Sequence, residues 1–401
     1  MPPNTSSPMA LPWHLPAPAV QAQRAALARQ RFFGEGVSPA GQIPDLVSQS
    51  WQRCVQAGLQ PGHRPMFQPV SRSKVNYLAG RDHVLLKAAQ RPFTELQAAL
   101  ARSRCKVLLT DRDGVLLRVT PAGSEDGLVM QAGCRVGVDL GELLVGTTAP
   151  SIAAHSGRSC AVQAGEHFYD ALGGVRCVAA PIRNRHGVVV AVLDLTIEDQ
   201  AFGFDAPWLV QAYAGTIENN LRIAQTRQQV LLRLHSAPSA LLGAQAGLAA
   251  VDEGGRISWL NAMAAALIGV NTTDARQFRC EELLGCTLEQ VLARSAARNA
   301  QPLLLPNGLT VWLLAEYRDL GDGENDATAA DDEPAPPAWQ RAADSGSAAP
   351  VPRPSTPSAT LAQLSRQLID QTLAECQGNV SQAARRLGVS RGLLYRRLRG
   401  D

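Results

Sequence analysis

Residues 319–358 have a composition that cannot build a core, and they divide the chain into a long part and a short one. Between Asp319 and Asp344 eight acidic residues accompany one basic residue, Arg341, and Pro, Ala, Ser and Gly supply most of the rest. Such a segment buries too little apolar surface to offset the conformational entropy lost on folding. We therefore expect a flexible acidic linker over 319–358, with a foldable part on either side of it.

The composition of the whole chain is that of a globular protein. Its 401 residues are 45% hydrophobic with a formal net charge of +3, enough for about two to four domains. The eight cysteines are scattered without a Cys-x-x-Cys pair, as is typical of thiols in a reducing compartment. The N-terminus lacks the features of a signal peptide, and the longest apolar run, "VVVAVLDL" at 188–195, is too short to span a bilayer. We expect a cytoplasmic protein without membrane contact.

The part before the linker begins with a lead-in, 1–84, that we expect to be partly disordered and partly helical. Two hairpins follow, "CKVLLTDRDGVLLRVT" with its Asp113-Gly114 turn and "VRCVAAPIRNRHGVVVAVLDLTI" with a turn near Asn184–Gly187. Between them, "GELLVGTTAPSIAAHSG" predicts one helix that ends at Gly157. The patterns predict a small antiparallel sheet flanked by helices over 85–206.

A second module follows a connecting segment. Apolar residues at helical spacing predict one helix over 207–235 that links two domains or, over its N-terminal half, belongs to the core of the first domain. Within 236–318, the stretch "GLAAVDEGGRISWLNAMAAALIGV" predicts two strands and a helix that begins after an asparagine. "PLLLPNGLTVWLLAEYR" predicts a further hairpin. We expect a second antiparallel sheet here.

The last residues, "GNVSQAARRLGVSRGLLYRRLRGD" at 378–401, contain six arginines and no acid before the final residue. Capping signals begin three helices at Thr360, Asn379 and Ser390, and Gly388 provides a turn before the last. A solvated basic tail would need neither caps nor interleaved leucines. The pattern therefore predicts an all-α helix-turn-helix over 359–401, with arginines on the open face of its last helix, where they suit guanine edges and phosphates.

This stretch resembles the Fis-type helix-turn-helix found at the C-terminal end of many bacterial activators. The resemblance implies a homodimer, formed through a helix near 361–376, that binds a palindromic site in double-stranded DNA. It also implies the residues that contact DNA: Asn379, Ser381, Ser390, Arg391, Tyr395, Arg396 and Arg399.

The part before the linker is similar to the sensor half of sigma-54-dependent activators of the acetoin-catabolism and dihydroxyacetone type. The similarity is carried by "SWQRCVQAGLQP", "GEHF", "CVAAPI" and "VLDLT". It implies a GAF-like domain at 85–206 with a small-molecule effector and a PAS-like domain at 236–318. It also implies an effector pocket that includes His167, Phe168, Cys177 and Asp194.

Activators of this type carry an ATPase between sensor and DNA reader, but this sequence has no phosphate-binding loop. Its three lysines, Lys74, Lys87 and Lys106, follow serine, leucine and cysteine, never glycine. We therefore expect no ATP-driven promoter opening.

Catalytic chemistry is the weaker interpretation of the sensor residues. A nucleophilic site could be drawn from His155, His167 and Asp194 with Cys160 or Cys177, and a metal site from Cys134, Cys160, Cys177 and His167. Neither set has the spacing of a known motif, so we expect core or pocket-lining roles, no catalytic residue, no metal and no cofactor.

The sequence therefore predicts a multidomain α+β transcriptional regulator, with two antiparallel-sheet sensor domains followed by an all-α DNA reader. Its expected partners are DNA, a small molecule, a second copy of the chain and RNA polymerase. The alternative is a sensor or scaffold that acts by protein contact, for example in mixed dimers with a full-length activator.

Overall fold

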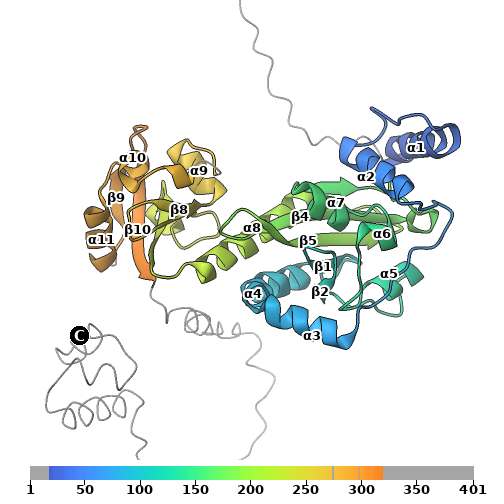
Figure 1. Ribbon diagram of the computed structural model, residues 1–401, viewed down its shortest axis with the longest axis horizontal. Coiled ribbons are helices and arrows are strands. Elements are labelled where there is room, and N and C mark those ends of the chain that lie inside the picture. Colours follow the sequence, from blue (N-terminus) through green and yellow to red (C-terminus); the bar gives the residue numbers. More distant parts are fainter. Residues whose placement is uncertain (1–17, 273–274, 298, 319–401) are drawn as a thin grey trace, which may run out of the picture. The chain divides into compact units, whose positions relative to one another are not determined.

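The computed structural model describes residues 18–272, 275–297 and 299–318, coloured in Figure 1. The expected linker at 319–358 and the expected helix-turn-helix at 359–401 lie outside the described residues. The described part contains two five-stranded antiparallel sheets with helices packed on them. This confirms an α+β architecture with two antiparallel sheets. None of the described helices is long and apolar enough to cross a bilayer.

The chain enters the structure through helices. These are α1 (Pro18–Arg29), a π-helical turn η1 (Gln30–Gly34), α2 (Asp45–Gln56), α3 (Arg72–Arg81) and α4 (His83–Ala99). Residues 18–34, which the composition placed in the partly disordered lead-in, are thus helical. Ala25 and Ala28 of α1 are buried, because their small side chains permit close packing of this helix. Ala28 belongs to the same core cluster as Trp51 of α2.

The first sheet has the strand order β2-β1-β5-β4-β3. Its strands are β1 (Lys106–Asp111), β2 (Leu116–Val119), β3 (Cys160–Val162), β4 (Val175–Arg183) and β5 (Val189–Glu198). Both predicted hairpins are present, because β1 pairs with β2 and β4 pairs with β5 in antiparallel register. Helices α4 and α8 (Ala206–Gln225) pack on one face of the sheet, and α2 and α7 (Ala149–Ser156) contribute to the core on the other (Figure 1).

The helix expected over 141–157 is two helices, α6 (Glu142–Val145) and α7. The prediction of one helix is wrong because Gly146 adopts φ 66° and ψ −152°, which breaks the helical path. A Cβ at this position would lie 2.8 Å from the Cβ of Phe168, so the close approach also requires glycine. Thr148 then begins α7 through a capping box with Ser151, and Gly157 ends it as predicted.

The helix expected over 207–235 is also shorter than predicted. Helix α8 ends at Gln225, Gln228 has a positive φ of 55°, and Gln229–His235 is the strand β6. This strand is buried on both faces: Leu232 and Leu234 belong to one core cluster and Leu231 to another. Its apolar residues are therefore nearly continuous, and positions 231 and 234 also fit helical spacing.

The second sheet has the order β8-β7-β6-β10-β9, with β6 at its centre. Its other strands are β7 (Gly247–Val251), β8 (Ile257–Leu260), β9 (Gln301–Leu304) and β10 (Thr310–Arg318). Both expected hairpins are present, and Asn261 accepts a hydrogen bond from the amide of Ala264 at the start of the predicted helix.

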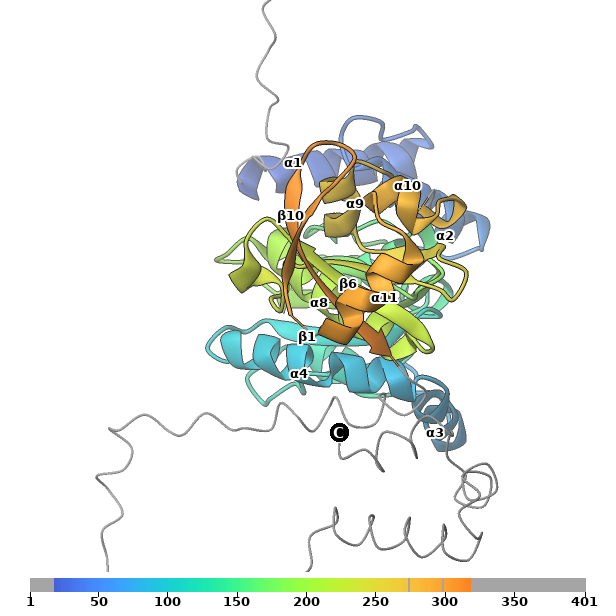
Figure 2. The same cartoon turned by 90° about the vertical axis from the view of Figure 1, so that its left-hand side faces the viewer.

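Three helices, α9 (Ala262–Ile268), α10 (Cys280–Leu284) and α11 (Leu288–Ala297), supply side chains to the core on one face of this sheet. Figure 2 faces this part and shows α11 in front of the strands β6 and β10 that it contacts. Ile223, near the end of α8, packs against the cluster on the other face. Short 3-10 turns complete the structure: η2 (Asp170–Leu172), η3 (Pro238–Ala240) and η4 (Ala275–Gln277).

Candidate effector site

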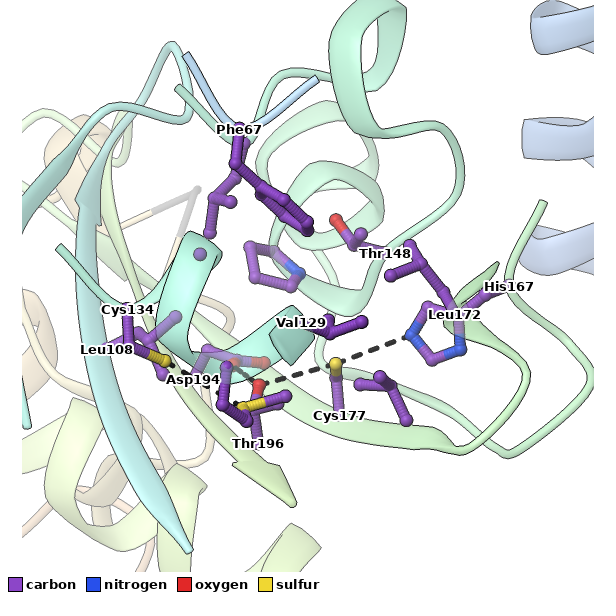
Figure 3. A pocket seen from close by; sticks show the side chains of 15 residues that line it. Phe67, Leu108, Val129, Cys134, Thr148, His167, Leu172, Cys177, Asp194 and Thr196 are labelled. Atoms are coloured by element: carbon purple, nitrogen blue, oxygen red, sulfur yellow. Dashed lines mark hydrogen bonds between the residues drawn. The ribbon is translucent and has the colours of Figure 1, made fainter. Parts of the chain in front are cut away.

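A cavity of about 50 Å³ lies on the face of the first sheet that α4 and α8 leave open (Figure 3). By the ~10–15 Å³ that one water-sized position occupies, it has room for a few heavy atoms. The short helix α5 (Leu128–Gly133) covers part of it. Most of the lining is apolar, and the lining residues are Phe67, Leu108, Val129, Met130, Gly133, Cys134, Leu140, Thr148, Pro150, His167, Leu172, Val175, Cys177, Asp194 and Thr196.

Strand alternation brings the polar side chains of the floor together. Cys177 on β4 pairs with Thr196 on β5, and Leu108 on β1 pairs with Asp194. Paired residues in antiparallel strands share a face, so these side chains all point away from α4 and α8. The intervening residues Leu193 and Leu195 pack on the opposite face. Asp194 is thus a fully buried carboxyl group within a largely apolar strand, with Thr196 two residues further along the same face.

A hydrogen-bonded row connects three strand residues with His167. The Thr196 hydroxyl contacts Asp194 Oδ2 and lies 3.3 Å from Cys177 Sγ. Cys177 Sγ lies 3.4 Å from His167 Nε2 (Figure 3). The other carboxyl oxygen, Asp194 Oδ1, is buried and has no hydrogen-bond partner among the described residues.

Burial disfavours the charged form of each of these groups. It raises the pKa of Asp194 to about 7, against a hydrogen bond from Thr196 that lowers it. Burial lowers the pKa of His167 to about 3, and burial together with the charge of Asp194 raises that of Cys177 well above its usual value. A thiol with a raised pKa and a neutral imidazole do not make an activated nucleophile.

The structure separates the remaining residues of the catalytic and metal alternatives. His155 is exposed, whereas Cys160 packs against the carbonyl of Ala149, with 3.3 Å between Sγ and the oxygen. Within the described residues no group of three His, Cys, Asp or Glu side chains is placed to hold a metal ion.

Of the four residues proposed for the pocket, His167, Cys177 and Asp194 line the cavity, and Phe168 lies elsewhere. The Phe168 ring is fully buried and makes edge contacts with Phe33 at 5.4 Å and Tyr169 at 5.3 Å between centroids. Phe168 thus belongs to the same core cluster as Trp51 and Tyr169 rather than to the lining of the cavity.

The loop that carries His167 is held by the N-terminal helices, which the sequence did not connect with the site. Arg29 of α1 donates to the carbonyls of His167 and Phe168, and Trp51 Nε1 of α2 donates to the carbonyl of Glu166 at 2.8 Å. Trp51 lies in the quoted "SWQRCVQAGLQP", so its motif was visible although its partner was not. Phe67, Thr148 and the α5 residues were missed as well, since nothing in their local pattern indicates a cavity.

The expected DNA contacts, Asn379, Ser381, Ser390, Arg391, Tyr395, Arg396 and Arg399, lie outside the described residues. Two family matches bear on the two parts of the chain. Residues 360–399 match the family described as "Bacterial regulatory protein, Fis family". Residues 18–215 match "MimR, N-terminal domain", which includes α1 to α4 in the same unit as the first sheet.

Curated relatives are transcriptional regulators. The chain is 29% identical over 217 residues to the "Acetoin catabolism regulatory protein" of Cupriavidus necator, covering 53% of this chain and 32% of that protein. It is 26% identical over 209 residues to the "Propane 2-monooxygenase operon transcriptional activator MimR" of Mycolicibacterium smegmatis, covering 51% and 34%. The chain thus spans about a third of the length of these relatives.

Among solved structures, the E. coli DhaR(N)-DhaL complex matches with a TM-score of 0.43 and 18% identity, covering 68% of this chain and 99% of that one. Together, the family matches show a Fis-family segment at the C-terminal end and a MimR-type sensor domain before it.

Proposed function

We propose that the protein is a DNA-binding transcriptional regulator that responds to a small molecule held in the cavity of the first sheet. The observation that carries this proposal is the occurrence in one chain of a Fis-family segment and a sensor-type domain with an internal cavity. The names of these relatives refer to acetoin catabolism and to a propane monooxygenase operon, that is, to the metabolism of molecules of a few carbons. A cavity of about 50 Å³ suits molecules of that size.

Within this proposal the first sheet with its helices is a GAF-like domain at 85–206 and the second is a PAS-like domain at 236–318. Five antiparallel strands with helices on them support both assignments. Helix α8 packs on the first sheet and, through Ile223, on the second, so it is placed to transmit the occupancy of the cavity. His167, Cys177 and Asp194 would contact the effector, and Phe168 would support the loop that carries His167.

The DNA reader is proposed from its sequence. A homodimer of the 359–401 segment would bind a palindrome through Asn379, Ser381, Ser390, Arg391, Tyr395, Arg396 and Arg399. RNA polymerase is the proposed further partner, because a regulator bound near a promoter acts on transcription. The protein would work without ATP-driven promoter opening, since no Gly-Lys-Ser/Thr phosphate loop occurs in the sequence.

Footprinting with the purified full chain on genomic fragments tests the proposal. A discrete protected palindrome is the expected result, and protection without sequence preference would contradict it. The second candidate is a protein that acts by contact with full-length activators, which the match of residues 18–215 to an N-terminal domain of such activators favours. It predicts no footprint for the chain alone and a footprint that changes when a full-length activator is present. DNA-stimulated ATP turnover by the pure protein would exclude the ATP-independent mechanism.

A further inference from the structure

An unpaired carboxyl oxygen in the cavity limits the charge of the molecule that the cavity accepts, given the proposed effector role of that cavity. Asp194 Oδ1 is a polar atom of a fully buried residue that lines the cavity and has no hydrogen-bond partner among the described residues. Buried polar atoms without a partner are rare, because each that is left unpaired destabilises the folded state. An oxygen-bearing molecule in the cavity would give Oδ1 the partner that the protein does not.

The described residues that line the cavity carry no positively charged side chain that could balance the charge of an anionic ligand. No lysine or arginine is present among the described residues that line the cavity. The polar groups near Asp194 are the Thr196 hydroxyl, the Cys177 thiol and, beyond it, the neutral His167 imidazole. A bound carboxylate would therefore be buried without a counter-charge beside a second carboxyl group, which is strongly unfavourable.

The protons of the row allow Oδ1 to act as donor or acceptor. Thr196 has one hydroxyl proton, so it donates either to Asp194 Oδ2 or to Cys177 Sγ. In the first case a protonated Asp194 carries its proton on Oδ1 and donates into the cavity. In the second case Oδ2 carries the proton toward Thr196, and Oδ1 is left as an acceptor. A ligand hydroxyl group can accept a hydrogen bond from Oδ1 in the first case and donate one to Oδ1 in the second. A ligand carbonyl group can only accept, so it fits the first case alone.

We propose that Asp194 recognises an uncharged ligand of a few heavy atoms by a hydrogen bond between Oδ1 and the hydroxyl or carbonyl group of the ligand, and that the cavity rejects organic acids and amines of the same size. An amine is rejected because moving its ammonium group from water into the apolar lining costs more free energy than one buried ion pair with Asp194 returns. Phe67, Val129 and Leu172 would contact the carbon atoms of the ligand.

Four probes of equal heavy-atom number and similar shape test this: 2-propanol, acetone, acetate and 2-propylammonium. Binding to the full chain is followed by the ¹³C-methyl resonance of Met130, which lines the cavity, assigned with Met130→Leu. We expect 2-propanol and acetone to shift this resonance with dissociation constants at least about tenfold lower than those of the two ions. Acetate or 2-propylammonium binding as tightly as the neutral probes would overturn the inference.

Variants locate the interaction. Asp194→Asn keeps a donor and an acceptor without a charge and should bind the neutral probes within about threefold of the wild type. Asp194→Leu introduces an apolar side chain of similar size and should weaken the binding of the neutral probes about tenfold or more. The matched control is Thr110→Val, because Thr110 Oγ1 is also buried without a described partner on β1 but does not line the cavity. Unchanged binding by Asp194→Leu, or equal losses in Thr110→Val, would contradict a role for Asp194.

The outcomes separate this inference from the proposed function. If no probe shifts Met130 in folded protein, the cavity is a packing defect and both the inference and the effector role of the cavity fail. If the ions bind as well as the neutral probes, only the inference fails. DNA binding is judged separately by the footprint, which none of these variants alters directly.

Discussion

Arg53 of α2 and Glu142 of α6 are joined by two hydrogen bonds, Nε to Oε2 at 2.7 Å and Nη2 to Oε1 at 2.8 Å. Ser50 donates to the same carboxylate and lies 2.7 Å from the hydroxyl of Thr147. The pair attaches helix α2 to residues 142–148, the segment that leads into α7. This segment ends at Thr148, which lines the cavity. Because both side chains are largely buried, with 29% and 18% of their surfaces exposed, the pair should contribute more than a surface ion pair does.

Glu142→Gln should lower the free energy of unfolding by about 1–3 kcal/mol, because it leaves a partly buried guanidinium without its charged partner. Urea denaturation of the full chain measures this. The control is Glu95→Gln, whose partner Arg91 lies 2.8 Å away but whose pair is 74% and 51% exposed. Its removal should cost no more than about 0.5 kcal/mol. Equal effects of the two substitutions would show that the Arg53–Glu142 pair does not secure the N-terminal helices.

Trp51→Phe should destabilise the protein by about 2 kcal/mol and loosen the loop that carries His167. The substitution keeps an aromatic ring in the cluster but removes the donor to the buried carbonyl of Glu166. Hydrogen exchange should therefore increase over residues 163–170 more than over β4 and β5. Trp208→Phe is the matched control, since Trp208 is 65% exposed. Unaltered exchange in the loop of the Trp51 variant would contradict this role.

Glu166 should make stability decrease as the pH rises. Burial raises the pKa of its carboxyl to about 7 in the folded protein, from 4.5 in the unfolded chain. The folded state therefore holds this proton more tightly, and the stabilisation is complete below pH 4.5 and is lost as the pH rises through about 7. The loss is on the order of 3 kcal/mol.

Glu166→Gln should abolish this part of the pH dependence, so the variant gains stability relative to the wild type between pH 5 and 8. Urea denaturation across that range measures the difference, in which the opposing contribution of His167 cancels. Glu289→Gln, at an exposed position of α11, should follow the wild type throughout. Parallel curves for Glu166→Gln and wild type would show that Glu166 titrates normally.

Arg391→Ala and Arg396→Ala should change which DNA sequence is selected, whereas Arg386→Ala should change only the affinity. A bidentate guanine contact by the last helix contributes about 1–3 kcal/mol of discrimination at one base position. A phosphate contact by the supporting helix weakens binding to all sequences alike and reduces the salt dependence by about one unit. Binding-site selection with each variant distinguishes the two. Recovery of the wild-type motif by both Arg391→Ala and Arg396→Ala would show that the last helix is not the reader.

Local signals were sufficient for the hairpins and for several helix ends. Asp113-Gly114 in the first hairpin, Asn261 before α9 and Gly157 after α7 have the predicted roles because turns and caps depend on a few adjacent residues. The prediction of one long helix over 207–235 was wrong because residues that are distant in the sequence, not adjacent ones, determine the structure of its second part. A strand buried on both faces has no alternation, so β6 differs from a helix only through its partners β7 and β10.

The residue order alone was enough to predict two antiparallel sheets and the resemblance to a Fis-type DNA reader. Only the tertiary structure decided that Asp194, Cys177 and His167 meet at one cavity while the adjacent Phe168 joins an aromatic core. The reason is physical: pairing of β4 with β5 and the hold of Arg29 and Trp51 on the His167 loop join residues far apart in the chain. Local propensity carries no information about contacts over such separations, because they depend on the packing of the whole domain.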